Sequence, residues 1–131
     1  MLSSIKNAKV MISFVYVALG GALGSLGRYI CTKYLLTNPA VGFPKGTFLV
    51  NVIGSFLIGV AWSLSKHYSL EFRNFFMVGI LGGFTTFSAF SLENVQLLQN
   101  GNIQLAFLYV LLSSTVCIVA TYLGVLLGGL R

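Results

Sequence analysis

Four long apolar runs, joined by short polar connections, restrict this chain to a narrow set of folds. A helix needs about 20 predominantly apolar residues to cross a bilayer, and each run approaches or exceeds that length. We therefore expect an all-α integral membrane protein in which residues 1–131 form a single four-helix membrane domain. The four expected transmembrane helices cover approximately residues 10–36, 47–65, 74–98 and 103–130.

The scarcity of charged residues points to the same class. Only 8% of the 131 residues are charged and 56% are hydrophobic, whereas a soluble domain carries about 25% charged residues. The net charge of +6 comes from basic residues scattered between, beside or near the ends of the apolar runs. That distribution is typical of membrane-flanking charge, and nucleic-acid binding needs a clustered basic face. We expect a multi-pass protein of the cell (plasma) membrane that binds no nucleic acid.

Residues that commonly carry catalysis or bind metals are few. Cys31 and Cys117 fall inside the first and fourth runs, where they are expected to act as small buried apolar side chains. His67 is the single histidine and lies in a connecting loop. The chain has no nucleophile beside a plausible base and no pair of acids. We expect no enzymatic activity.

The N-terminus has features of a secretory signal. Lys6 and Lys9 precede an apolar run that leads into the small residues "ALGGALGS". Cleavage there would leave three spans and would discard a helix that continues, glycine-rich and polar, through Arg28. We therefore expect the first helix to be retained.

Small and polar residues inside the runs indicate how the helices pack. Two small-xxx-small pairs allow close backbone approach without saying which helix each one meets; they are Gly20-xxx-Gly24 and Gly124-xxx-Gly128. Polar residues also recur four apart, on one helix face; they are Asn51 and Ser55 in the second span, and Tyr109, Ser113, Cys117 and Thr121 in the fourth. Each polar residue alone is explained by a hydrogen bond between helices. Together with the third span, the two stripes favour a lined pathway, which we expect at an interface between copies.

The third span contains the stretch "GILGGFTTFSAFSLE" at residues 79–93. Gly82-Gly83 followed by Thr85-Thr86 predicts an interrupted helix. Non-helical backbone at membrane depth is tolerated only where it is buried in protein or lines a wet cavity. The half-helix before a break exposes carbonyls, which suit a cation, and the half-helix after it exposes N–H groups, which suit an anion. Thr85 or Thr86 is a natural N-cap for the restarted helix.

Phe87, Phe90 and Glu93 follow this break at a spacing that places them close to one helix face. Two phenylalanines in an apolar run are ordinarily core residues. Beside an interrupted helix and polar stripes they acquire a second interpretation, because an aromatic ring has a positive edge that can meet an anion.

Three stretches resemble the signature segments of the Fluc (CrcB) fluoride channels. They are "GGALGSLGRY" at 20–29, "PKGTFLVNVIGSFLIG" at 44–59 and the stretch at 79–93. The resemblance runs over nearly the whole chain, with four spans in matching order. It implies a fluoride-specific ion channel that exports fluoride passively across the cell membrane and relieves fluoride toxicity. It also implies a homodimer whose two subunits insert in opposite orientations (an antiparallel, dual-topology dimer).

The resemblance further implies roles for single residues. Asn51 corresponds to a pore asparagine, and Phe87 and Phe90 correspond to stacked pore phenylalanines. Further polar positions of the implied fluoride pathway are Ser88, Glu93, Tyr109 and Ser113. A structural Na⁺ that is not transported would be held by the backbone carbonyls of Gly82 and Thr85. Cys117 departs from the pattern, which has a hydroxyl there, and the role of Arg28 stays open between structure and attraction of anions.

Two other classes remain as alternatives. A four-helix multidrug antiporter has a similar size, but its signature is a membrane-embedded glutamate in the first helix, and here the only embedded acid is Glu93 in the third span. A non-conducting membrane scaffold would not need the polar stripes. Flux of fluoride against chloride into proteoliposomes separates all three classes.

Overall fold

The protein is a bundle of long helices. The computed structural model describes residues 2–35, 42–65 and 68–130, and this part of the chain contains helices and no strand. Four of its helical segments are long and apolar enough to cross a membrane, as the sequence predicts. They cover Lys9–Tyr34, Lys45–Leu64, Leu70–Gln99 and Ile103–Gly129. Residue 36, the predicted end of the first span, lies outside the described residues.

The four spans are built from eight helical segments. The first span is α1 (Leu2–Ile30) followed by the π-helix η1 (Cys31–Leu35). The second is α2 (Lys45–Leu64), and the fourth is α6 (Ile103–Gly129). The third is composite: α3 (Leu70–Arg73), the π-helix η3 (Asn74–Leu81), α4 (Gly82–Phe84) and α5 (Phe87–Gln99).

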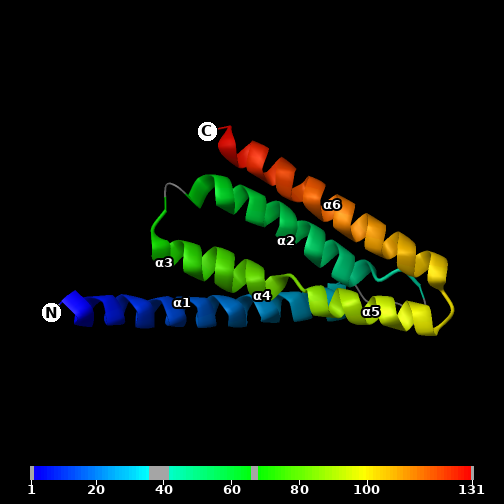
Figure 1. The fold of residues 1–131 in the computed structure, drawn as a ribbon, viewed down its shortest axis with the longest axis horizontal. Helices are drawn as coiled ribbons and strands as arrows, with labels where there is room; N and C mark the ends of the chain where they lie inside the picture. Colours follow the sequence, from blue (N-terminus) through cyan, green and yellow to red (C-terminus); the bar gives the residue numbers. More distant parts are fainter. Residues whose placement is uncertain (1, 36–41, 66–67, 131) are drawn as a thin grey trace.

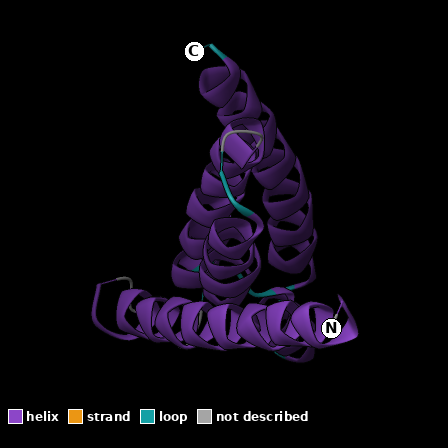
Figure 2. Cartoon of the chain, turned by 90° about the vertical axis from the view of Figure 1, so that its left-hand side faces the viewer, coloured by secondary structure: helices purple, strands orange, loops and turns teal. Residues whose placement is uncertain are grey.

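The spans lie in a fixed order across the bundle. Figure 1 shows the third span between α1 and α2, with α6 on the far side of α2. Figure 2 shows α1 running obliquely across the base of the other helices. The described ends of the chain, the end of α2 and the start of α3 lie at one end of the bundle (Figure 1). The connection between α5 and α6 lies at the opposite end.

Glycines hold two helix pairs in close contact. A Cβ at Gly20 would lie 2.2 Å from the Phe75 carbonyl oxygen, and one at Gly24 would lie 2.1 Å from the Ile80 carbonyl oxygen. A Cβ at Gly124 would likewise lie 2.2 Å from the Phe56 carbonyl oxygen. Only glycine permits backbones to approach this closely inside a bilayer. The first pair therefore joins α1 to η3, and the second joins α6 to α2.

The third span is interrupted at Thr85 and Thr86, as its sequence predicts. Both residues are extended, with ψ 155° at Thr85 and φ −149°, ψ 116° at Thr86. Helical structure resumes at Phe87, where the Thr86 hydroxyl accepts a hydrogen bond from the Ala89 N–H (3.2 Å). This is the N-cap geometry expected of threonine.

The sharp turn between α5 and α6 follows from the sequence "QNGN". The Gly101 N–H donates to the Leu98 carbonyl (3.0 Å), and the Asn102 N–H donates to the Leu97 carbonyl (2.9 Å). With Gly101 at φ +75°, this is a Schellman C-cap, which requires the left-handed conformation that glycine adopts without strain. The turn brings α6 back antiparallel to α5 and so places Tyr109 beside the residues that follow the break.

Candidate functional site

The break in the third span is stabilised by one side chain of α2. The Asn51 amide nitrogen donates to the Thr86 carbonyl (3.0 Å), and the Asn51 amide oxygen accepts from the Thr86 N–H (2.8 Å). Both backbone polar groups of this buried threonine are thereby satisfied by one amide, as buried polar groups require. Asn51, predicted as a pore residue, lies at the break itself.

Two carbonyls near the break lose the donors that a continuous helix would give them. An α-helix pairs each carbonyl with the N–H four residues later. The donor for Gly82 would be the Thr86 N–H, which is bound by Asn51. The donor for Thr85 would be the Ala89 N–H, which is bound by the Thr86 hydroxyl. The break releases the last four carbonyls before it from helical pairing, those of residues 82–85. The two carbonyls predicted to hold Na⁺ are among them.

Gly82 and Thr85 line a groove of about 210 Å³, which we call the break groove. Its other lining residues are Asn51, Gly54, Ser55, Ile58, Met77 and Leu81. Gly82 is exposed, and a Cβ placed on it would meet only the Met77 carbonyl oxygen, at 3.9 Å. The atoms available to bind a cation at this groove are backbone and amide oxygens, which suit a hard cation such as Na⁺. The residues present fit the predicted ion.

A second groove, of about 300 Å³, is also lined by Asn51. We call it the phenylalanine groove, and it is lined by Asn51, Phe87, Phe90, Ser113, Ser114, Cys117 and Ile118. The rings of Phe87 and Phe90 lie 5.4 Å apart between centroids and are tilted by 41°. The structure thus brings two predicted residues of α5 together with predicted residues of α2 and α6.

Ser113 carries the buried polar group of this groove that lacks a hydrogen-bond partner in the described part of the chain. Its hydroxyl oxygen is buried and makes no hydrogen bond within the described part of the chain. A buried, unsatisfied hydroxyl is costly, so such a group calls for a partner that the single chain does not supply. Cys117 lines the same groove one turn further along α6, where its thiol is a weaker donor than a hydroxyl.

Glu93 binds hydroxyls from two other helices. Thr47 on α2 donates to one carboxylate oxygen (2.6 Å), and Tyr109 on α6 donates to the other (2.8 Å). Tyr109 is fully buried, and its ring contacts Phe90, with centroids 5.0 Å apart. The predicted residues Glu93 and Tyr109 are therefore direct partners, adjacent to the phenylalanine groove.

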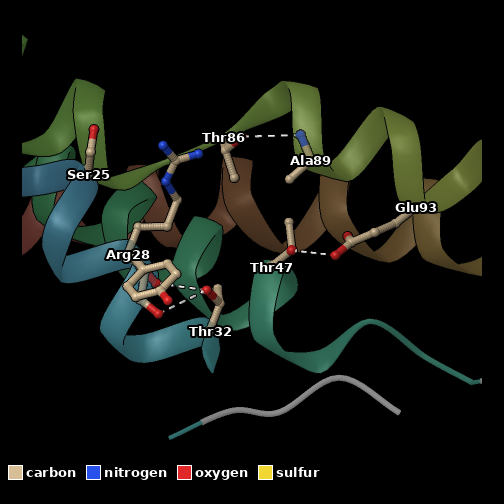
Figure 3. Close-up of a pocket in the computed structure, with 8 residues that line it drawn as sticks. Ser25, Arg28, Thr32, Thr47, Thr86, Ala89 and Glu93 are labelled. Carbon is tan, nitrogen blue, oxygen red and sulfur yellow. Dashed lines mark hydrogen bonds between the residues drawn. The ribbon is translucent and has the colours of Figure 1, made fainter. Parts of the chain in front are cut away.

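A third groove, of about 370 Å³, opens beside the break on the side of α1. We call it the arginine groove; its lining residues are Ser25, Arg28, Tyr29, Thr32, Thr47, Thr86, Ala89 and Glu93. Figure 3 shows the Arg28 side chain extending from α1 toward Thr86, with Thr47 bound to Glu93 on the facing side. The Arg28 guanidinium is a permanent positive charge, which attracts anions, and it shares this groove with the Glu93 carboxylate.

Sequence reasoning missed one contributor to this region and left two others open. It gave Thr47 no role beyond the start of a span, named Thr86 as one of two possible caps, and left Arg28 open between structure and attraction of anions. Ser88, which was predicted, is exposed and shares a hydrogen bond with Thr86 (3.1 Å); it is not among the lining residues of the three grooves. No local pattern connects Thr47 to Glu93, which lies 46 residues away.

Comparison with known families identifies the chain. Residues 15–125 match the family model described as "CrcB-like protein, Camphor Resistance (CrcB)". The chain belongs to the CrcB family. This CrcB chain is 44% identical over 121 residues to a protein of Agrobacterium fabrum named fluoride-specific ion channel FluC, a match covering 90% of this chain and 97% of the relative.

Other relatives carry the same name. A FluC of Parabacteroides distasonis is 41% identical, covering 90% of this CrcB chain and 94% of its own length. One of Thermus thermophilus is 47% identical, covering 88% and 93%. These relatives are named as channels, in agreement with the prediction that the protein is not an enzyme. Four membrane-spanning helices and this family place the CrcB chain in the cell membrane as a multi-pass protein.

Proposed function

We propose that this chain forms a channel that conducts fluoride passively through the phenylalanine groove. The observation that carries the proposal is the buried hydroxyl of Ser113, which has no hydrogen-bond partner among the described residues and lines that groove with Asn51 and the paired rings of Phe87 and Phe90. A hydroxyl and an amide can donate to an anion, and ring edges offer it positive partial charge. The names of the relatives agree with this reading.

The chemistry of the groove suits a small, strongly hydrated anion. Such an ion enters only if closely placed donors replace its water, and it leaves only if no single site binds it too tightly. The phenylalanine groove is lined by neutral side chains, and the fixed cation, Arg28, lies in the neighbouring arginine groove. The cation that attracts anions thus lies in a different groove from the one proposed to conduct them. With the membrane potential negative inside, an anion is driven outward without any other energy source, so the channel would relieve fluoride toxicity.

We infer that two copies assemble in opposite orientations. Phe87 is 78% exposed in the single chain, although an aromatic ring at the centre of a lined path needs walls on every side. The charge difference between the two ends of the bundle is small. Basic residues at the end with the termini are Lys6, Lys9, Lys66, Arg73 and Arg131, and those near the other end are Arg28, Lys33 and Lys45; Lys66, Arg131 and the Lys6 side chain lie outside the described residues. A weak positive-inside bias permits both insertions.

A Na⁺ ion at the break groove is the second part of the assembly. The Gly82 and Thr85 carbonyls, released from helical pairing, would be its ligands. When bound, the ion would supply positive charge to the free carbonyls at the end of the half-helix before the break. Because one chain offers few ligands, a second copy facing it would complete the coordination. This places the ion at the centre of the dimer, as a structural component.

Purified protein in proteoliposomes tests the function directly. With a valinomycin-clamped potential, we expect fluoride efflux that chloride does not replace. Empty liposomes and a Phe87→Leu, Phe90→Leu double variant provide the controls. Equal fluoride and chloride flux, or none above empty liposomes, would contradict the proposal, and drug-dependent proton flux would favour an antiporter.

A further inference from the structure

The interruption of the third span is stabilised by a side chain from a different helix. Thr86 is extended and exchanges two hydrogen bonds with Asn51. The Thr86 N–H donates to the Asn51 amide oxygen (2.8 Å), and the Asn51 amide nitrogen donates to the Thr86 carbonyl (3.0 Å). Residues that face each other in an antiparallel sheet exchange two bonds in the same way. One amide of α2 therefore takes the place of a neighbouring strand.

This pairing opposes closure of the helix. In a continuous helix the Thr86 N–H would bind the Gly82 carbonyl. Asn51 occupies that donor, so the Gly82 carbonyl stays free of the helix and Thr86 keeps the extended backbone. In that conformation the Thr86 hydroxyl caps α5 through the Ala89 N–H. The position at which α5 begins thus follows from the contact with Asn51.

Packing around the break gives the pair little freedom. Thr86 is buried, with 7% of its surface exposed, so water is a poor substitute for Asn51. Next to it, a Cβ on Gly54 would lie 2.2 Å from the Thr85 methyl carbon. Glycine at this position lets α2 approach the break closely enough for Asn51, one turn earlier, to reach it.

Asn51 also connects the two grooves. It lines both the break groove and the phenylalanine groove. Its amide carries two N–H donors, and one of them is used on the Thr86 carbonyl. The same side chain can therefore hold the break and still present a hydrogen to the phenylalanine groove.

We propose that Asn51 is a positioning residue. Its paired hydrogen bonds with the Thr86 backbone keep the third span interrupted and fix the residue at which α5 begins, and so the positions of Phe87 and Phe90. This role is distinct from donation to a passing anion. The effect of this role on fluoride flux rests on the proposed function, whereas the stabilisation of the break by Asn51 does not.

The test measures the Thr86 backbone directly, by NMR of isotope-labelled protein in nanodiscs. In Asn51→Ala we expect amide exchange at Thr86 to rise by about five- to tenfold, the effect of losing one hydrogen bond, and the Thr86 carbon shifts to leave extended values. Asn51→Asp keeps an acceptor for the Thr86 N–H but loses the donor to its carbonyl. In that variant the amide should stay protected while the carbonyl shift changes and flux falls.

Ser55→Ala is the matched control, because Ser55 lies one turn along α2 and lines the same break groove. It should leave Thr86 exchange and shifts at wild-type values. Wild-type exchange and shifts in Asn51→Ala would overturn the proposal, whatever the flux. If Asn51→Ala does not fold, an unchanged Thr86 carbonyl shift in Asn51→Asp overturns it instead. Absence of fluoride flux in the wild type would reject the proposed function, and the exchange data would still decide the role of Asn51.

Discussion

The Tyr109 hydroxyl on α6 donates a 2.8 Å hydrogen bond to Glu93 on α5, directly beside the ring of Phe90. The second carboxylate oxygen of Glu93 accepts from Thr47 on α2. One acid therefore joins three helices at the end of the bundle that follows the break. The Tyr109 ring, held by this hydrogen bond, contacts the Phe90 ring with centroids 5.0 Å apart.

Tyr109→Phe removes this hydrogen bond and keeps the ring. Interhelical hydrogen bonds in membranes contribute about 0.6 kcal/mol on average and up to about 1.7 kcal/mol, and we expect a loss of stability in that range, with reduced fluoride flux. Steric-trap or thermal unfolding measures the first effect and liposome efflux the second. Tyr122→Phe is the control, since Tyr122 lies on the same helix and is 63% exposed. Equal effects of the two substitutions would count against a role for the contact with Glu93.

Replacing Phe87 or Phe90 with Leu tests whether their rings face the anion. Swaps of similar volume usually cost less than about 1.5 kcal/mol of stability. We expect Phe90→Leu to have the larger effect on stability, because Phe90 packs on Tyr109 whereas Phe87 is exposed. Both variants should lose roughly tenfold or more in fluoride flux, because an aliphatic group has no ring edge. Leu92→Met, at an exposed neighbouring position, should conduct normally. Wild-type flux in folded Phe→Leu variants would return both rings to a packing role.

Neighbouring glycines of α1 should respond in opposite ways to alanine. A Cβ at Gly20 would lie 2.2 Å from the Phe75 carbonyl oxygen, whereas one at Gly21 meets nothing within 4 Å. We expect Gly20→Ala to destabilise the protein by about 1–3 kcal/mol, the usual effect of overpacking. Gly21→Ala should be neutral, or stabilising by up to about 1 kcal/mol from helix propensity. Unfolding curves of the two variants provide the comparison, and similar midpoints would mean that α1 does not pack on η3 through Gly20.

Removal of Na⁺ should slow or stop fluoride flux reversibly, with no accompanying Na⁺ current. Replacement of Na⁺ by a large organic cation in efflux assays measures this dependence. Full activity after exhaustive replacement would argue against the ion. Thr85→Ser should be mild, because the proposed ligand is a backbone carbonyl.

Gly82→Val should abolish flux for a reason outside the single chain. Gly82 has ordinary helical angles (φ −65°, ψ −36°), and its Cβ direction is open. The chain itself should therefore fold with wild-type helical content. We expect loss of the dimer in light scattering, because the added side chain would occupy the space assigned to the ion and the second copy. A dimeric, conducting Gly82→Val protein would place that interface elsewhere.

We expect the protein to insert into the membrane in both orientations. The C-terminus, labelled with a membrane-impermeant reagent on a functional tagged protein, should be accessible from both sides of the cell membrane. The weak charge difference between the two ends is the physical reason. Labelling from one side only would refute the antiparallel dimer.

The sequence by itself determined the four helices, the interruption of the third and a cap at Thr85 or Thr86, of which the structure selects Thr86. Each depends on residues within a few positions of one another: apolar length for the spans, and Gly82-Gly83 before Thr85-Thr86 for the break. The pattern of three separate stretches also indicated the family, which the comparisons confirm.

Only the tertiary structure decided which groups meet. Gly20 and Gly24 could have packed on any helix or on another copy, and they face η3. Asn51 could be recognised as a polar residue on a helix face, but not as the partner of Thr86, 35 residues away. No sequence pattern indicated a role for Thr47, and its hydrogen bond to Glu93 is seen only in the structure. The physical reason is that local conformation follows from neighbours in sequence, whereas a hydrogen bond between helices depends on crossing geometry, which the packing of glycines and side chains sets together.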